Sequence, residues 1–266
     1  MEQHHLYELR TWFDEYVAGF YGDDEFINTN VKLKEDHTRR TCQEMLYLAD
    51  KLDLSDPQKY LAEIIARFHD IGRFEQFTKY RTFNDAVSIR HSLWGARILR
   101  QMKVLDSLEK QQQELIVRAV VYHAERQLPR DLDDQSLMYV KLIRDADKLD
   151  IYRVVTRHYK DQRDNPKQSV LWLGLPDDPV CSSHVVKKTM RGESVDYRTL
   201  RTLNDLKLMQ LGWVYDINFV ATLERIKKRG FLKMLADSLP NTPDIEGIKE
   251  KIFSYVGSKI RLDAVS

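Results

Sequence analysis

The chain has 266 residues, with 42 lysines and arginines against 41 aspartates and glutamates, so its formal net charge is only +1. This balance gives no general electrostatic reason to bind nucleic acid or a membrane surface. The two cysteines, Cys42 and Cys181, cannot form a disulfide framework and suit a reducing compartment. There is neither the basic start and apolar run of a signal peptide nor an apolar stretch long enough to cross a bilayer. We therefore expect a cytoplasmic protein.

Apolar residues recur at helical spacing along almost the whole chain, while alternating β-branched runs are nearly absent. This pattern predicts an all-α fold. Ser55-Asp56-Pro57 is a typical helix start, because serine caps the beginning of a helix and proline is tolerated in the first turn. Residues 75–87 look irregular, and residues 161–179, which are polar and contain three prolines, are expected to form a loop or lid. The predicted helices are residues 6–20, 35–53, 56–70, 88–102, 107–125 and 135–159, followed by 179–190, 201–212, 213–229, 230–238 and 243–262.

Several histidines and one aspartate lie on the apolar stripes of these helices, where an unpaired polar group is costly. His69 follows Ile65 by one helical turn, and Asp147 lies between Ile143 and Ile151 on the buried line of its helix. A divalent cation would satisfy all such side chains together, since imidazole and carboxylate are common metal ligands. The inward-facing positions are His37, His69, His91, His123 and Asp147.

Each of these residues also has a purely structural explanation. A single inward histidine is more often a hydrogen-bonded core residue than a ligand. Asp147 could instead be the buried salt-bridge partner of Lys148 or Arg144. Asp145 competes with Asp147 as a ligand, although it projects from another side of the helix, where it would more naturally support a ligand.

The ordered set His37, His69-Asp70 and Asp147 resembles the H…HD…D signature of the HD-domain superfamily of metal-dependent phosphohydrolases. The local contexts match as well: residues 68–72 (FHDIG) look like the helix-end motif, and residues 145–150 (DADKLD) look like the closing segment. The resemblance implies that these four residues bind metal, and it favours the aspartate before the lysine as the ligand.

The resemblance covers about residues 30–160 and implies that this part is an HD-domain helical bundle. No linker is long enough to demand two independent domains, so we expect a single all-helical domain over residues 1–266. The HD core would span about 30–160, and additional C-terminal helices would form an extension over about 161–266. Whether that extension caps the site, forms a dimer contact or binds a partner is left open by the sequence.

His91 and His123 resemble the additional histidines of HD proteins that hold two metals, in which the aspartate matching Asp70 bridges both ions. The cofactor is therefore expected to be a divalent metal, one or two ions, drawn from Mn, Fe, Mg, Co, Ni or Zn. The resemblance implies one metal held by His37, His69, Asp70 and Asp147, and a second held by Asp70, His91 and His123.

Other features of the sequence narrow the choice among HD-domain subfamilies. No Gly-Tyr-Pro motif follows, which disfavours a cyclic di-GMP phosphodiesterase, and residues 73–75 (RFE) replace the Glu-Asp pair of the stringent-response hydrolases. The chain is short for the large deoxynucleotide triphosphohydrolases. The contexts of His91 and His123 resemble the bacterial dinucleoside-polyphosphate hydrolases, but the C-terminal segment has no counterpart there.

The implied function is a phosphohydrolase, either a phosphomonoesterase or a phosphodiesterase, that cleaves a phosphate ester of a nucleotide with a metal-activated water. His69 and Asp70 would be central to catalysis, and Arg73 and Lys148 would contact phosphate oxygens unless they are surface ion-pair residues. Two alternatives stay open: an HD-type di-iron oxygenase with the same six ligands, and a nucleotide-sensing regulatory module. The expected partner is a small phosphorylated substrate, with no membrane and no strong nucleic-acid signal, and the protein would be a monomer or a homodimer.

Overall fold

The computed structural model describes residues 1–164 and 174–263. These residues form helices joined by turns and loops and contain no strand, so the predicted all-α class is confirmed. The chain divides into two compact units, Met1–Asp150 and Ile151–Ser266, and α7 (Asp134–Asp164) runs through the division. No helix in the described part is long and apolar enough to cross a membrane. The expected single domain with its core and extension stays a prediction.

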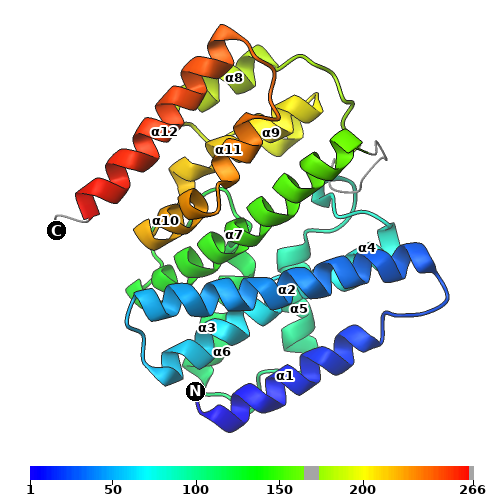
Figure 1. The fold of residues 1–266 in the computed structure, drawn as a ribbon. Helices are drawn as coiled ribbons and strands as arrows, with labels where there is room; N and C mark the ends of the chain where they lie inside the picture. Colours follow the sequence, from blue (N-terminus) through cyan, green and yellow to red (C-terminus); the bar gives the residue numbers. More distant parts are fainter. Residues whose placement is uncertain (165–173, 264–266) are drawn as a thin grey trace. The chain divides into compact units, whose positions relative to one another are not determined.

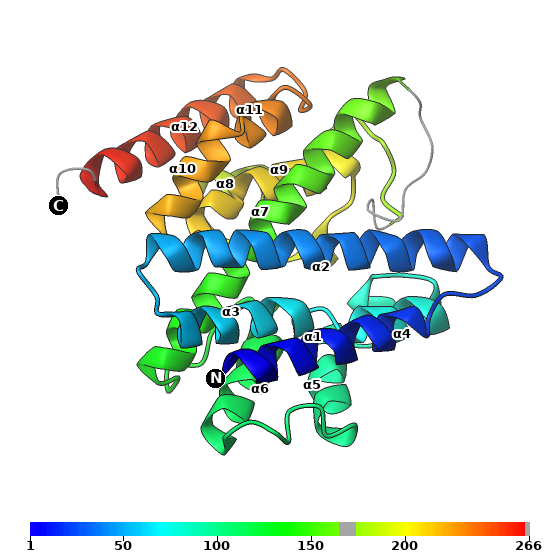
Figure 2. The same ribbon diagram turned by 60° about the horizontal axis from the view of Figure 1, so that its bottom comes forward.

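The first unit is a bundle in which α3 contacts both α1 and α2, while α5 contacts α4 and α6 (Figures 1 and 2). Large side chains fill its interior, and Phe13, Met45, Ile64 and Phe68 are almost completely buried. The elements before α7 are α1 (Gln3–Ala18), α2 (Glu25–Lys51), α3 (Asp56–Phe68), α4 (Gly72–Tyr80), η1 (Asp85–Val87), α5 (His91–Gln101) and α6 (Lys110–Tyr122).

Two helix starts show how the sequence sets the lengths of α2 and α3. The α3 start matches the prediction, because Ser55 and Gln58 form a capping box in which the Gln58 side chain accepts from the Ser55 N–H at 2.9 Å. The α2 start lies well before the predicted residue 35. The Asp24 side chain accepts from the N–H of Ile27 at 3.1 Å and so caps the helix at that earlier point.

The prediction that residues 75–87 are irregular is wrong over the first half of that segment, where α4 extends to Tyr80. Packing explains the helix, because Phe74 and Phe77 lie one turn apart and are both buried in the core. The Phe74 ring centroid lies 5.9 Å from that of Phe13, and the Phe77 centroid lies 4.5 Å from that of Phe83. These tertiary contacts stabilise a short helix that its own composition predicts poorly.

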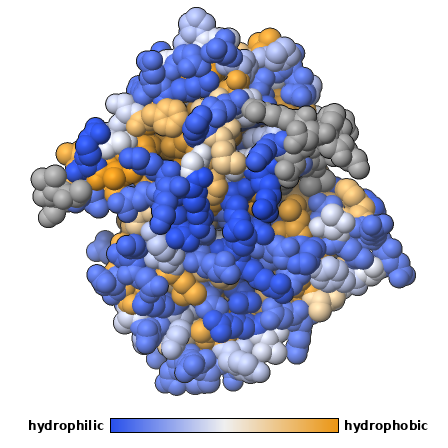
Figure 3. All heavy atoms as spheres, in the orientation of Figure 1, coloured by the Kyte–Doolittle hydropathy of each residue, from blue (hydrophilic) through white to orange (hydrophobic). Residues whose placement is uncertain are grey.

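The second unit packs the end of α7 with the remaining helices. The buried Tyr152 hydroxyl donates to the backbone carbonyl of Gln210 at 2.8 Å, and the Tyr159 hydroxyl donates to the Gln210 side chain at 3.0 Å. On the face shown in Figure 3, hydrophilic side chains predominate. The elements after α7 are α8 (Ser183–Arg191), η3 (Tyr197–Thr199), α9 (Leu203–Gly212), η4 (Trp213–Asp216), α10 (Val220–Lys228), α11 (Phe231–Ala236) and α12 (Pro243–Asp263).

The predicted loop over residues 161–179 is wrong at its start, since α7 continues to Asp164. Residues 165–173 of that loop lie outside the described residues, and residues 174–179 contain no helix, as expected.

Gly72 allows the closest approach of backbones in the first unit. A Cβ atom at this position would lie 2.2 Å from the carbonyl oxygen of His91 and 2.9 Å from the backbone nitrogen of Gly95. Both are backbone atoms at the start of α5, so neither can move aside without moving the helix. Gly72 therefore holds the start of α4 against the start of α5, two residues after Asp70.

We expect Gly72→Ala to lower the free energy of unfolding by about 1–3 kcal/mol, because the added methyl group forces the two helices apart. The matched control is Gly22→Ala, since a Cβ at Gly22 meets nothing within 4 Å. Urea unfolding of both variants measures the difference. Equal stability of the two variants would contradict the close approach described here.

Candidate metal centre

The first three side chains of the centre come from α2 and the end of α3. His37 lies on the buried face of α2, and His69 and Asp70 directly follow the last residue of α3. Phe68 is fully buried just before them and anchors this helix end in the core. The capping box at Ser55 fixes where α3 begins, so the length of the helix determines where the histidine and aspartate lie.

The other residues of the centre come from α5, α6 and α7. His91 is the first residue of α5, and His123 directly follows the last residue of α6. Asp147 lies on α7. Arg144, one turn before it, donates to the carbonyl oxygens of His123 and Glu125 and so holds the end of α6.

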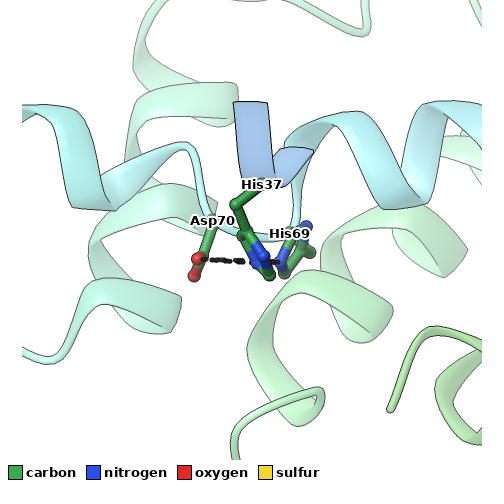
Figure 4. A group of neighbouring side chains, drawn as sticks. All are labelled: His37, His69 and Asp70. Carbon is green, nitrogen blue, oxygen red and sulfur yellow. Dashed lines mark hydrogen bonds and ion pairs between the residues drawn. The ribbon is translucent and has the colours of Figure 1, made fainter. Parts of the chain in front are cut away.

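Four of the predicted ligands form a first group. The Nε2 atom of His37 lies 3.2 Å from Nε2 of His69, 3.1 Å from Oδ1 of Asp147 and 3.6 Å from Oδ2 of Asp70. His69 Nε2 lies 3.7 Å from both of those carboxylate oxygens. Figure 4 shows His37 approaching from α2 and the His69-Asp70 pair from the end of α3, with their polar atoms directed toward one another.

A second group forms on the other oxygen of the same aspartate. The Nε2 atoms of His91 and His123 lie 3.2 Å apart. They lie 3.3 Å and 3.7 Å, respectively, from Oδ1 of Asp70. Asp70 therefore presents one oxygen to each pair of histidines, which is the arrangement expected of a carboxylate that bridges two ions.

The four histidines all direct Nε2 into the centre because Nδ1 is held elsewhere. A carbonyl or carboxylate oxygen only accepts hydrogen bonds, so the nitrogen bonded to it carries the proton, and Nε2 of the neutral ring carries a lone pair. The Nδ1 donations are His37 to Asp150 (2.8 Å), His69 to the carbonyl of Ala66 (2.7 Å), His91 to Asp85 (2.7 Å) and His123 to the carbonyl of Val120 (2.7 Å).

Facing lone pairs repel one another unless a proton or a cation lies between them. Two nitrogens that each lie about 2.1 Å from one shared ion are separated by roughly 3.0–3.4 Å at octahedral to tetrahedral angles. The 3.2 Å separations of His37 from His69 and of His91 from His123 both fall in this range. The side chains present therefore fit a divalent cation in each group.

The protonation states also suit metal ligands. Burial acts to raise the pKa of the Asp70 carboxyl. The nearby Lys34 and His69 lower it by more than burial raises it, so the pKa is well below its usual range. Burial also acts to raise the pKa of Asp147, and interactions with His37 and His69 hold it well below its usual range. The centre therefore carries two ionised carboxylates.

The histidines differ in their affinity for a proton. Burial lowers the pKa of His69, and burial together with the nearby Arg73 lowers the pKa of His91 to about 4. For His37, burial and Lys34 lower the pKa, but Asp147 and Asp150 outweigh them and raise it overall. His91 is therefore neutral near pH 7. Its Nε2 atom carries no proton, so this nitrogen presents a free lone pair to the second group.

In each group, one histidine is oriented by an aspartate that also bonds an arginine. Asp150 accepts from Arg40 Nε at 2.6 Å and Arg40 Nη2 at 2.9 Å, in addition to His37. Asp85 accepts from Arg73 Nη1 at 2.8 Å and from Gln76 Nε2 at 2.9 Å, in addition to His91. Such outer carboxylates fix the ring orientation and increase the basicity of the ligating nitrogen.

The remaining predicted site residues lie at the edge of the centre or away from it. Arg73 Nη1 donates to Asp85 and to the carbonyl of Phe83, and its Nε lies 3.4 Å from Oδ1 of Asp70. Lys148 adjoins Asp147 in sequence and is half-buried. Asp145 is fully buried but belongs to neither group among the described residues.

Sequence reasoning missed Lys34, Asp85 and Asp150. Lys34 Nζ donates to Oδ2 of Asp70 at 2.7 Å. Its position one turn before His37, and that of Asp150 one turn after Asp147, are spacings that a search of each ligand's helix face would have found. Asp85 lies in the segment predicted to be irregular, where no periodic signal exists.

The helices α2, α3, α5, α6 and α7 bring imidazoles and carboxylates together around one shared aspartate, an arrangement that could hold metal ions. The HD-domain family model matches residues 35–152, and this segment contains all the side chains of both groups. Residues 35–152 therefore belong to the HD-domain superfamily. Searches of the curated proteins and of the solved structures found no match.

HD domains bind divalent metals and are typical of metal-dependent phosphohydrolases. Three overlapping sets of side chains could hold such ions: His37, His69 and Asp70; His69, His123 and Asp147; and Asp70, His91 and His123. Within the described residues, no such set lies outside these six side chains. The family and the geometry therefore agree on where a metal would bind.

We expect Asp150→Asn to weaken metal binding by about 10–100-fold, because the amide keeps the shape but removes the charge that supports His37 and neutralises Arg40. Competition against a fluorescent chelator measures the dissociation constant. Asp50→Asn is the control, since Asp50 is exposed and pairs only with Lys59 in a surface ion pair. Metal affinity equal to that of the control would show that Asp150 does not support the ligand.

Proposed function

We propose that the protein is a metal-dependent phosphohydrolase that cleaves a phosphate ester of a nucleotide. The observation that supports this most directly is the convergence of two histidine pairs on opposite oxygens of Asp70. The proposed ligands of the first ion are His37, His69, Asp70 and Asp147, and those of the second are Asp70, His91 and His123.

The chain's own residues would hold and orient the reacting groups. When bound, divalent cations would polarise the phosphate and lower the pKa of water from about 16 toward about 7. His69 and His91, whose pKa values are lowered, and the ionised Asp70 and Asp147 supply ligands without having to lose a proton first. The Asp147 side chain is 18% exposed, whereas that of His69 is fully buried, so solvent reaches the centre from the side of Asp147.

The two groups have unequal numbers of protein ligands. On this assignment, the first ion has four protein ligands and the second has three. We therefore propose that the second ion keeps more positions for water and substrate. Arg73 and Lys148 stay proposed as residues that contact phosphate oxygens, with Arg73 nearer to Asp70.

Elemental analysis of the purified protein, followed by phosphate release across a nucleotide library, tests this function. We expect close to two divalent ions per chain and release of phosphate from at least one phosphate ester. Iron with oxygen consumption and no phosphate release would favour the di-iron oxygenase. Tight nucleotide binding without turnover would favour a regulatory module.

We expect His69→Ala and Asp70→Ala each to remove bound metal and to reduce turnover by at least about 1000-fold, because each change removes a ligand of the proposed centre. His184→Ala is the matched control: His184 is half-buried on α8, belongs to neither group, and bonds the carbonyl of Thr199. Full metal content with full turnover in either ligand variant would contradict the assignment.

A further inference from the structure

Lys34 is the one lysine among the described residues whose ammonium contacts a proposed bridging ligand. Its Nζ lies 2.7 Å from Oδ2 of Asp70, and its side chain is 17% exposed, which places the ammonium between the buried centre and solvent. The same ammonium lies 5.3 Å from the centroid of the Phe83 ring. Among the described residues, no other hydrogen-bond acceptor contacts it.

The position of Lys34 on α2 explains this contact. Lys34 lies three residues before His37, so both side chains project from the same face of the helix. Oδ2 of Asp70, which accepts from Lys34, is also the oxygen that the first histidine pair approaches. Lys34 and the first proposed cation are therefore neighbours of one carboxylate oxygen.

The charge of the centre shows why Lys34 needs another partner once cations are bound. Asp85 and Asp150 are neutralised by Arg73 and Arg40, so only Asp70 and Asp147 remain to balance the ions. Two dications bring four positive charges against these two negative charges, and Lys34 adds a fifth positive charge. Like charges this close, in a partly buried site, repel strongly unless an anion joins them.

We propose that Lys34 binds an oxygen of the substrate's phosphate when cations occupy Asp70, and that the group it selects is a terminal, doubly charged phosphate. This inference rests on the proposed phosphohydrolase function. A dianionic phosphate neutralises more of the excess charge than the single charge of a phosphodiester. The flexible lysine stem allows Nζ to move from Asp70 to an adjacent anion, and an ammonium is a common phosphate-binding group.

Binding of inorganic phosphate to the manganese-loaded protein tests the proposal without requiring turnover. Calorimetric titration at about pH 8, where phosphate is a dianion, would compare the wild type with Lys34→Met and Lys34→Arg. Lys32→Met is the matched control, because Lys32 lies on the same helix, is mostly exposed and pairs with Asp36. The metal content of each variant is measured in parallel.

We expect Lys34→Met to keep the wild-type metal content and to bind phosphate about tenfold or more weakly. Lys34→Arg should recover part of the affinity, because it keeps the charge, and Lys32→Met should match the wild type. Loss of metal from Lys34→Met, with normal phosphate affinity in the loaded fraction, would show that Lys34 only holds Asp70 in place. That result would overturn the proposal, as would the absence of phosphate binding by the loaded wild type.

Dimethyl phosphate carries a single negative charge, so its binding tests whether the site prefers a doubly charged phosphate. We expect the wild type to bind it at least about tenfold more weakly than inorganic phosphate, and Lys34→Met to narrow this difference. Equal binding of the two anions by the wild type would overturn the preference for a terminal phosphate. Lys34→Met could weaken phosphate binding while the protein releases no phosphate from any nucleotide in the library. That result would contradict the proposed hydrolase function but support Lys34 as part of a phosphate-binding site.

Discussion

The Asp70 carboxylate lies between two pairs of imidazole nitrogens, and these nitrogens repel one another unless positive charge lies among them. Each ring is held in this orientation by a hydrogen bond on its far nitrogen, so the repulsion cannot be relieved by rotating a ring. The first unit therefore maintains a centre whose side chains could hold a cation. The close approach at Gly72 lies beside the same centre, because it brings the backbone two residues after Asp70 against the backbone of His91.

The two histidine pairs are built in the same way. In each pair, one histidine directly follows a helix and bonds the carbonyl three residues earlier: His69 after α3 and His123 after α6. The other histidine in each pair bonds an aspartate that is itself paired with an arginine. Asp147 breaks this correspondence, because its Oδ1 lies 3.1 Å from Nε2 of His37 and it also groups with His69 and His123. The unequal ligand number, rather than the histidine geometry, is what distinguishes the two proposed ions.

Helical periodicity predicted the all-α class and most helices, because a buried stripe is visible in any amphipathic helix. The same stripes identified His37, His91, His123 and Asp147, since a polar residue on an apolar line is conspicuous. Periodicity failed for α4, whose nine residues are too few for a clear stripe and depend on Phe74 and Phe77 packing elsewhere. It also missed Asp85, which lies in a segment without a periodic signal. Lys34 was missed although it lies one turn before His37, because the face of that helix was searched for ligands and not for cations.

The ligands that meet at Asp70 come from segments spread between residues 37 and 147, while the only cysteines, Cys42 and Cys181, are unpaired thiols. A bound cation would therefore close long chain loops much as a covalent cross-link does, and it would restrict the unfolded ensemble only while it stays bound. An ion present at about 100 times its dissociation constant would add roughly 2.7 kcal/mol to the folded state. The lifetime of the first unit would thus follow the supply of free metal in its surroundings.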